Sequence, residues 1–224
     1  MSILTLFVVI PLLMLLGLWL SKNLNQVRGV MVVGATALLA LSIWLTVYFI
    51  DQRASGNTAN MLLTYSVTWF EPLKIAYSVG VDGISVVMIL LSAIIVFTGT
   101  FASWQLKPLT KEYFLWFVLL SIGVFGFFIS TDMFTMFMFY EVALIPMYLL
   151  IGVWGTGPKE YSAMKLTLML MGGSALLILG ILGIYFFSGA QTMNVADLAQ
   201  LHAMPKSIQN IFFPFVFIGF GVLG

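Results

Sequence analysis

The sequence has no cysteine, only one histidine and very few charged residues. Charged residues make up 8% of its 224 residues, where soluble proteins have about 25%. Without cysteine, disulfide bonds, iron–sulfur clusters and thiolate metal sites are excluded, and His202 alone cannot supply paired haem ligands. The glycines around Gly155 and Gly157 lack the spacing of a phosphate-binding loop. Any redox or nucleotide chemistry therefore belongs to other chains.

The charge balance and the apolar content define the class of protein. Nine Lys and Arg face eight Asp and Glu, a net charge of +1, which offers no surface for a nucleic-acid backbone. Apolar residues make up 62% of the chain, against about 45–50% in soluble proteins. This composition predicts an integral membrane protein in contact with the lipid bilayer.

Long apolar runs fill most of the chain, and about 20 apolar residues suffice to span a membrane. Runs without charge, apart from Glu141 in the fifth, cover residues 2–21, 29–50, 83–106, 113–131, 133–158, 166–196 and 207–224. The sequence predicts an all-α polytopic membrane protein with about seven transmembrane helices. The sixth is expected to end near Ser188 and the seventh to be incomplete.

These runs predict five regions along the chain. Helices 1 and 2 are expected in residues 1–50, and an outside loop in residues 51–81. Helices 3 to 6 are expected in residues 82–187. An interfacial segment follows in residues 188–208, and residues 209–224 begin helix 7. In the outside loop, residues 62–69 and 74–79 are rich in Thr, Tyr and Val and flank Glu71-Pro72, which predicts a surface β-hairpin. Residues 192–209 place Val195, Leu198, Leu201 and His202 at helical spacing, as in a short interfacial helix.

The distribution of Lys and Arg over the loops predicts the orientation. With the N-terminus outside, six of these residues fall in inside loops and three, Arg53, Lys74 and Lys206, fall outside. The first span is not expected to be a cleavable signal, because no positive residue precedes it and no small-residue cleavage site follows it. The N-terminus is thus predicted to be outside.

Glu141 is the most informative residue. It follows Asp132 by nine residues, which places it about 13 Å into an apolar core of about 30 Å. A carboxyl group at that depth is costly and is by default functional, although a structural glutamate that joins helices is the alternative. Burial disfavours the ionised form, so the group can take up and release a proton when a lysine or water approaches.

Three residues near Glu141 support weaker hypotheses. Pro146 has no N–H group, so the Val142 carbonyl loses its helical hydrogen-bond donor and a kink is expected there. Tyr148 shares a helix face with Glu141. Lys165 is either a lysine that reaches the inner surface or a cation that modulates Glu141.

Other residues are expected to be structural. Asp82 and Asp132 are expected to cap the helices that follow them, because an acid favours a helix N-terminus. Close helix packing is expected at three glycines of the sixth span, Gly172, Gly173 and Gly180.

The run from Asp132 to Gly155 contains Glu141-Val-Ala-Leu-Ile-Pro146-Met-Tyr148. It strongly resembles the fifth membrane helix of the antiporter-like subunits of respiratory complex I, NADH:quinone oxidoreductase, and is most similar to chain M, the counterpart of mitochondrial subunit 4. Asp82-Gly-Ile-Ser85 after a surface hairpin also resembles that chain. The resemblance covers the chain from about residue 60 onward.

The resemblance implies the N-terminal portion of a subunit of about fourteen helices in a bacterial inner membrane, which translocates protons. Glu141 maps onto a family glutamate that pairs with a helix-seven lysine, which would lie beyond Gly224. NADH, FMN, iron–sulfur clusters and quinone are handled by other subunits, with no cofactor on this chain. The implied partners are neighbouring antiporter-like and other membrane-arm subunits. Two alternatives remain: a subunit of a multisubunit Na⁺/H⁺ antiporter and a structural membrane spacer.

Overall fold

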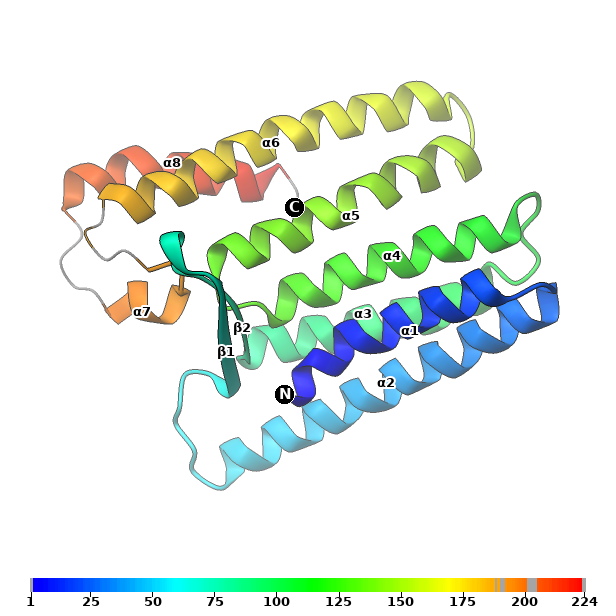
Figure 1. The fold of residues 1–224 in the computed structure, drawn as a ribbon, viewed down its shortest axis with the longest axis horizontal. Coiled ribbons are helices and arrows are strands. Elements are labelled where there is room, and N and C mark those ends of the chain that lie inside the picture. The colour runs from blue at the N-terminus through cyan, green and yellow to red at the C-terminus, as the bar shows by residue number, and fades with distance from the viewer. Residues whose placement is uncertain (1, 188, 190–191, 201–204, 223–224) are drawn as a thin grey trace. The chain divides into compact units, whose positions relative to one another are not determined.

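The structure is a computed structural model that describes residues 2–187, 189, 192–200 and 205–222. Helices account for most of these residues (Figure 1). They are α1 (Leu6–Leu20, preceded by the 3₁₀ turn Ile3–Thr5), α2 (Leu24–Ala54), α3 (Gly83–Ala102), α4 (Thr110–Ile129), α5 (Met133–Trp154), α6 (Lys159–Phe187), α7 (Val195–Gln200) and α8 (Lys206–Gly221). The predicted helical fold class is confirmed.

Six helices, α1 to α6, are long and apolar enough to cross a membrane. The seventh predicted span forms α8, whose 16 residues measure about 24 Å, short of an apolar core of about 30 Å. The predicted interfacial segment contains the short helix α7. Leu201 and His202, which the sequence placed on that helix, lie outside the described residues.

The predicted hairpin is also confirmed. Strand β1 (Leu62–Phe70) pairs with β2 (Ile75–Val81) in a two-stranded sheet, joined by the 3₁₀ turn Glu71–Leu73 (Figure 1). Lys74 closes this turn in the left-handed region, with φ of 49°. Pro72 in the turn fixes its own φ and cannot extend the β1 ladder, so the chain reverses at this point.

The chain divides into two compact units, and the division falls within the hairpin strands. The first unit comprises Met1–Tyr65 and Gly80–Ile129 and thus contains α1 to α4. Its core includes the fully buried Phe7 and Phe125, whose ring centroids lie 5.5 Å apart.

Two basic side chains link the connecting loops of the first unit by hydrogen bonds. Lys111 Nζ donates to the carbonyls of Trp19 and Ser21, at 3.0 and 2.8 Å, and so binds the end of α1 to the start of α4. Arg28 at the start of α2 donates to the carbonyl of Trp104 at 2.8 Å, just after α3. The four helices therefore run alternately up and down, as the sequence predicts.

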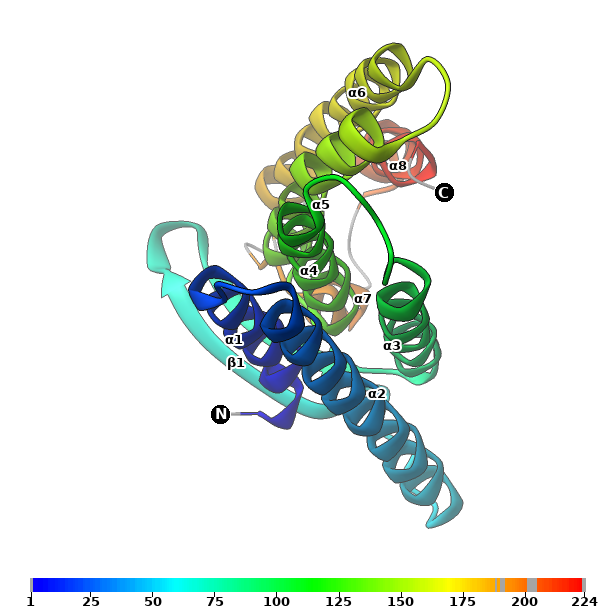
Figure 2. The same ribbon diagram turned by 90° about the vertical axis from the view of Figure 1, so that its right-hand side faces the viewer.

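The second unit comprises Ser66–Val79 and Ser130–Gly224 and contains the hairpin tip with α5, α6, α7 and α8. Its helices α6 and α8 lie side by side in both views (Figures 1 and 2). One buried cluster joins α6 to the hairpin and to the segment before α7; its members are Ile75, Leu177, Ile181, Tyr185 and Met193.

Glycines allow α8 to approach α6 closely. A Cβ atom at Gly180 would lie 2.6 Å from Val216 Cγ2, and one at Gly173 would lie 2.9 Å from Val222 Cβ. Close packing at these two glycines is thereby confirmed. Gly172 faces open space instead, so the expectation for that residue is wrong: it lies 100° around the helix from Gly173.

Candidate functional site

Glu141 lies in the interior of α5, eight residues after the first residue of the helix. At 1.5 Å per residue it is about 12 Å from one end of a helix about 33 Å long. The side chain is partly exposed on the isolated chain, but its Oε1 atom is buried and has no hydrogen-bond partner among the described residues. One of the two carboxyl oxygens is thus unsatisfied within the apolar span of α5.

An unpaired carboxyl oxygen in an apolar setting is energetically unfavourable. Burying a polar group without a hydrogen bond costs about 1–3 kcal/mol, and burying an unpaired charge costs more. A cation or a water molecule that approached this oxygen would satisfy it. Chemically, this arrangement suits a group that exchanges a proton.

The start of α5 is held by the Asp132 side chain. Asp132 Oδ1 accepts the backbone N–H of Thr135 at 2.9 Å, the predicted helix cap. Its Oδ2 also accepts the N–H of Ala76 on β2, at 3.3 Å, and Thr135 Oγ1 donates to the Ala76 carbonyl at 2.9 Å. Sequence analysis anticipated the cap but not the link to the hairpin, because a contact across 56 residues has no local signal.

The backbone beside Asp132 is bound on two sides. Thr131 N donates to the Ser78 carbonyl at 2.9 Å, next to a β-bridge between Val79 and Ser130. On the other side Met133 N donates to the Met193 carbonyl at 2.9 Å. The short stretch before α5 therefore joins the hairpin to the segment that precedes α7.

Burial has a clear effect on Asp132. The residue is 1% exposed, and loss of solvent raises the pKa of its carboxyl group above the ordinary value, although the N–H donors of Thr135 and Ala76 oppose this shift. Asp132 lies just before the membrane-spanning part of α5. Asp132 therefore caps the helix, and burial makes the ionised form of its carboxyl group less favourable.

Tyr140, directly before Glu141, links α5 to α6. Its hydroxyl donates to the Leu170 carbonyl at 3.4 Å, and the residue is 7% exposed. The sequence analysis did not single out this residue, because a tyrosine in an apolar run is more often a packing residue. The bond fixes the axial alignment of the two antiparallel helices at this point.

Lys165 lies in the second turn of α6, because that helix already begins at Lys159 rather than at residue 166. Its side chain is exposed, with Nζ 5.9 Å from the centre of the Tyr161 ring. It precedes Leu170 by five residues, about 7.5 Å along the helix away from the Tyr140 level. The described residues include no ion pair between Lys165 and Glu141, so its modulating role stays a prediction.

The two remaining predicted residues differ in exposure. Pro146 is buried inside α5, and the helix continues through it to Trp154 as one element. Tyr148 is 41% exposed, so the structure leaves its ring at the surface of the unit while Glu141 Oε1 is buried. Their supporting roles also stay predictions.

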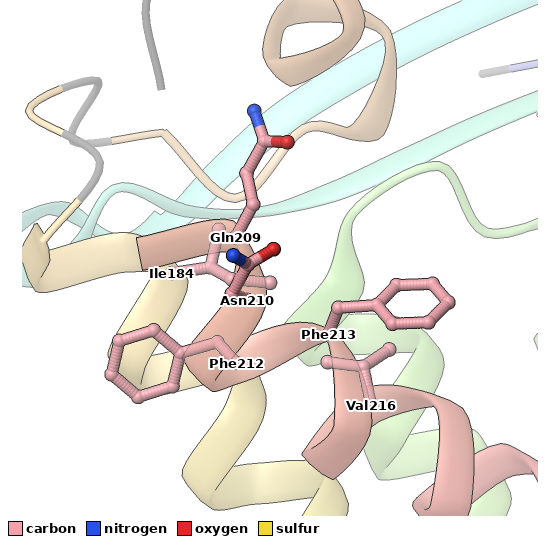
Figure 3. A pocket seen from close by; sticks show the side chains of 6 residues that line it. All are labelled: Ile184, Gln209, Asn210, Phe212, Phe213 and Val216. Atoms are coloured by element: carbon pink, nitrogen blue, oxygen red, sulfur yellow. The ribbon is translucent and has the colours of Figure 1, made fainter. Parts of the chain in front are cut away.

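Two cavities adjoin the helices of the second unit. One, of about 350 Å³, lies beside the first half of α5 and is lined by Trp69, Tyr77, Thr135, Met138, Phe139 and Val142. The other, of about 540 Å³, lies between α6 and α8 and is lined by Ile184, Gln209, Asn210, Phe212, Phe213 and Val216 (Figure 3). The lining of both is mainly apolar and contains no acid or lysine, so neither supplies a charged partner for Glu141.

No group of three or more metal-ligating side chains occurs in the part of the chain that the structure describes. The six membrane helices, the hairpin and a membrane-embedded acid define a polytopic membrane protein with an antiporter-like fold. Residues 130–224 match the family described as NADH:quinone oxidoreductase/Mrp antiporter, TM.

Known proteins extend this likeness beyond the matched residues. NADH-quinone oxidoreductase subunit M of Rickettsia typhi is 29% identical over 90% of this chain and 41% of its own length. A chain of respiratory complex I from Thermus thermophilus has a TM-score of 0.78 at 21% identity, over 98% of this chain and 42% of that one. A chain of the Mrp complex from a Dietzia species has a TM-score of 0.77 at 20% identity, over 96% and 39%.

The resemblance to the N-terminal portion of subunit M is thus confirmed. The chain spans less than half the length of the curated relatives it matches, from 30% to 45%. The two solved structures show the shared fold.

Proposed function

We propose that this chain forms part of a proton-translocating membrane-arm subunit of a bacterial NADH:quinone oxidoreductase. The subunit couples quinone reduction elsewhere in the complex to proton movement across the inner membrane. Other antiporter-like subunits are its neighbours, and its N-terminus faces the periplasm. NADH, FMN, iron–sulfur clusters and quinone belong to other subunits, and this chain has no redox centre.

The observation that supports this proposal is the unpaired Glu141 carboxyl group inside α5. A carboxyl group about 12 Å from the helix end has little access to bulk water, and its Oε1 is buried without a partner among the described residues. A purely structural glutamate would be expected to have its hydrogen bonds satisfied. An unsatisfied one suits a group whose partner arrives and leaves.

The mechanism that we propose uses Glu141 as a proton carrier. When a cationic partner, the helix-seven lysine implied by the resemblance, approaches, the ionised carboxylate is favoured and its proton is released. When the partner withdraws, the carboxylate stands alone in an apolar setting and takes up a proton. Electron transfer on other subunits drives this alternation by changing the electrostatics along the membrane arm. Pro146 and Lys165 have supporting roles.

The test is Glu141→Gln in the complete native gene, with Glu160→Gln as the matched control. Glu160 lies on the exposed first turn of α6, so its neutralisation leaves the interior unchanged. NADH-to-quinone electron transfer, proton pumping and complex assembly are measured in native membranes. We expect Glu141→Gln to assemble but to lose pumping and coupled turnover, and Glu160→Gln to retain them. Assembly with near-normal rates in Glu141→Gln would make the carboxyl group structural and the proposal wrong.

A second candidate function is Na⁺/H⁺ exchange, which the likeness to a chain of the Mrp complex favours. It predicts sodium-dependent proton exchange in membrane vesicles without association with NADH oxidation. The complex I proposal predicts the reverse, namely NADH-driven pumping that persists without added sodium.

A further inference from the structure

Asp132 and Asp82 cap helices in the same way but differ in their other contacts. Each accepts the backbone N–H three residues on, from Thr135 at 2.9 Å and from Ser85 at 2.8 Å. Only Asp132, of these two, has a further bond to a distant segment, from the N–H of Ala76 at 3.3 Å. The chain therefore provides a local cap and a bridging cap for direct comparison.

The bridge contacts one residue of β2 at two points. Asp132 accepts the N–H of Ala76 while Thr135 donates to its carbonyl, at 3.3 and 2.9 Å. Asp132 and Thr135 stand three residues apart at the first turn of α5, so the two bonds fix rotation of the helix as well as its axial position. Both side chains are buried, so the loss of either bond leaves a polar group with little access to solvent.

A helix transmits this constraint to Glu141. The carboxyl group of Glu141 stands about 6 Å from the helix axis, so a rotation of the first turn by about 20° moves it by about 2 Å. No hydrogen bond among the described residues holds its Oε1 in place. The direction in which the group points thus depends on how the first turn is anchored.

We infer that Asp132, with Thr135, positions Glu141: the paired bonds to Ala76 set the rotation and level of α5 and thereby the place where the Glu141 carboxyl group meets its proton partners. This inference rests on the proposed function. Asp132 does not itself exchange the transported proton. It is a positioning residue, held between the hairpin and the first turn of the helix.

The decisive variant is Thr135→Val, which keeps the shape of the side chain and the backbone N–H that Asp132 caps, but loses the hydroxyl group that donates to the Ala76 carbonyl and bonds to the Asp132 carboxyl group. Asp132→Ala removes both acceptors, and Asp132→Asn keeps an acceptor for Thr135 but offers an amide to the Ala76 donor. Asp82→Ala is the matched control, because it removes a cap of the same geometry without the bridge. All are made in the complete native gene and measured in assembled complexes in native membranes.

We expect Thr135→Val and Asp132→Ala to lower protons pumped per electron, up to about tenfold, because small misplacements of a reacting group have large effects. The pH profile of coupled turnover is expected to move in the same variants, with Asp132→Asn between them and wild type. Asp82→Ala should leave both unchanged.

The other titratable groups of the elements packed on α5 are the same in every variant, but Asp132→Ala and Asp132→Asn remove the titration of Asp132 itself, so the pH profile is decisive only in Thr135→Val. These other groups lie on the hairpin and on α6: Tyr65, Glu71, Lys74, Tyr77, Lys159, Glu160, Tyr161, Lys165 and Tyr185.

A merely structural role would lower the amount of complex without moving the pH profile. If Asp132→Ala fails to assemble, Thr135→Val decides the matter, since it removes one hydroxyl group and no charge. A Thr135→Val complex with the pumping ratio and pH profile of Asp82→Ala overturns the inference. If Glu141→Gln retains pumping, the proposed function fails; if Glu141→Gln abolishes pumping while Thr135→Val is normal, only the positioning role fails.

Discussion

The hydroxyl group of Tyr140 donates to the carbonyl of Leu170 at 3.4 Å and so joins α5 to α6 one residue before Glu141. A membrane interior offers no water to replace a lost hydrogen bond between helices, although such bonds contribute only modestly. This bond, the Asp132 bridge and the glycine contacts of α6 are three places where the second unit can be tested.

Tyr140→Phe removes only the hydroxyl group of Tyr140. We expect the free energy of unfolding to fall by about 1 kcal/mol, because the Leu170 carbonyl loses a donor in a buried place. Thermal unfolding of the detergent-solubilised protein measures the effect. The control is Tyr148→Phe, at a residue 41% exposed, which should change stability by less than about 0.5 kcal/mol. Equal effects in the two variants would show that the bond to Leu170 contributes nothing.

Glu141→Met replaces the unpaired carboxyl group by an apolar side chain of similar length. We expect the free energy of unfolding to rise by about 1–2 kcal/mol while pumping is lost, because the buried oxygen no longer needs a partner. Glu160→Met, at an exposed position, should be near neutral in both respects. Thermal unfolding and pumping are measured on the same preparations. A marked loss of stability in Glu141→Met would mean that the carboxyl group is satisfied in the folded protein.

Gly180→Ala and Gly172→Ala add the same methyl group to opposite environments on α6. At Gly180 the methyl group would lie 2.6 Å from Val216 Cγ2 and 3.2 Å from Val216 N, so we expect a loss of about 1–3 kcal/mol. At Gly172 it would meet nothing within 4 Å, and the better helix propensity of alanine should add about 0.5–1 kcal/mol. Thermal unfolding should thus give shifts of opposite sign. Shifts of the same sign would contradict the packing of α8 on α6.

Asp132 predicts a pH dependence of stability. Burial raises the pKa of its carboxyl group in the folded protein, so in the pH range between the ordinary and the raised pKa the folded form binds more protons than the unfolded form. Stability therefore falls as pH rises through this range, from about pH 4 upward, and the loss is complete above the raised pKa.

The measurement compares the unfolding midpoint of wild type and Asp132→Asn across that range. The advantage of wild type over Asp132→Asn should shrink as the pH rises, because the amide group of the variant does not titrate. Asp82→Asn, which leaves Asp132 intact, should keep the wild-type slope. A difference that stays constant with pH would place the pKa of Asp132 at its ordinary value.

Much of the fold follows from local features of the sequence. The apolar runs predicted the membrane helices, and residues rich in Thr, Tyr and Val around Pro72 predicted the hairpin, since strand propensity and a turn residue act within a few residues. Asp82 and Asp132 were recognised as caps because a cap needs only an acceptor three residues before a free N–H. Glu141 was recognised by its depth alone.

Contacts between distant segments were beyond such reasoning. Nothing near Ala76 indicates that its N–H and carbonyl meet Asp132 and Thr135, and nothing near Tyr140 indicates that its hydroxyl meets Leu170. The glycines show the limit most directly: Gly172 and Gly173 are neighbours in the sequence, yet only one of them faces α8.

The sequence by itself determined that this is a helical membrane protein with one acid deep in its fifth helix. Composition and the length of the apolar runs suffice to identify the segments that lie in the membrane. The tertiary structure decided what surrounds that acid: an oxygen without a partner among the described residues, and a first helical turn bound to a distant strand. The reason is physical. The cost of burying a group is set by its type and depth, whereas its partners are set by which segments pack together.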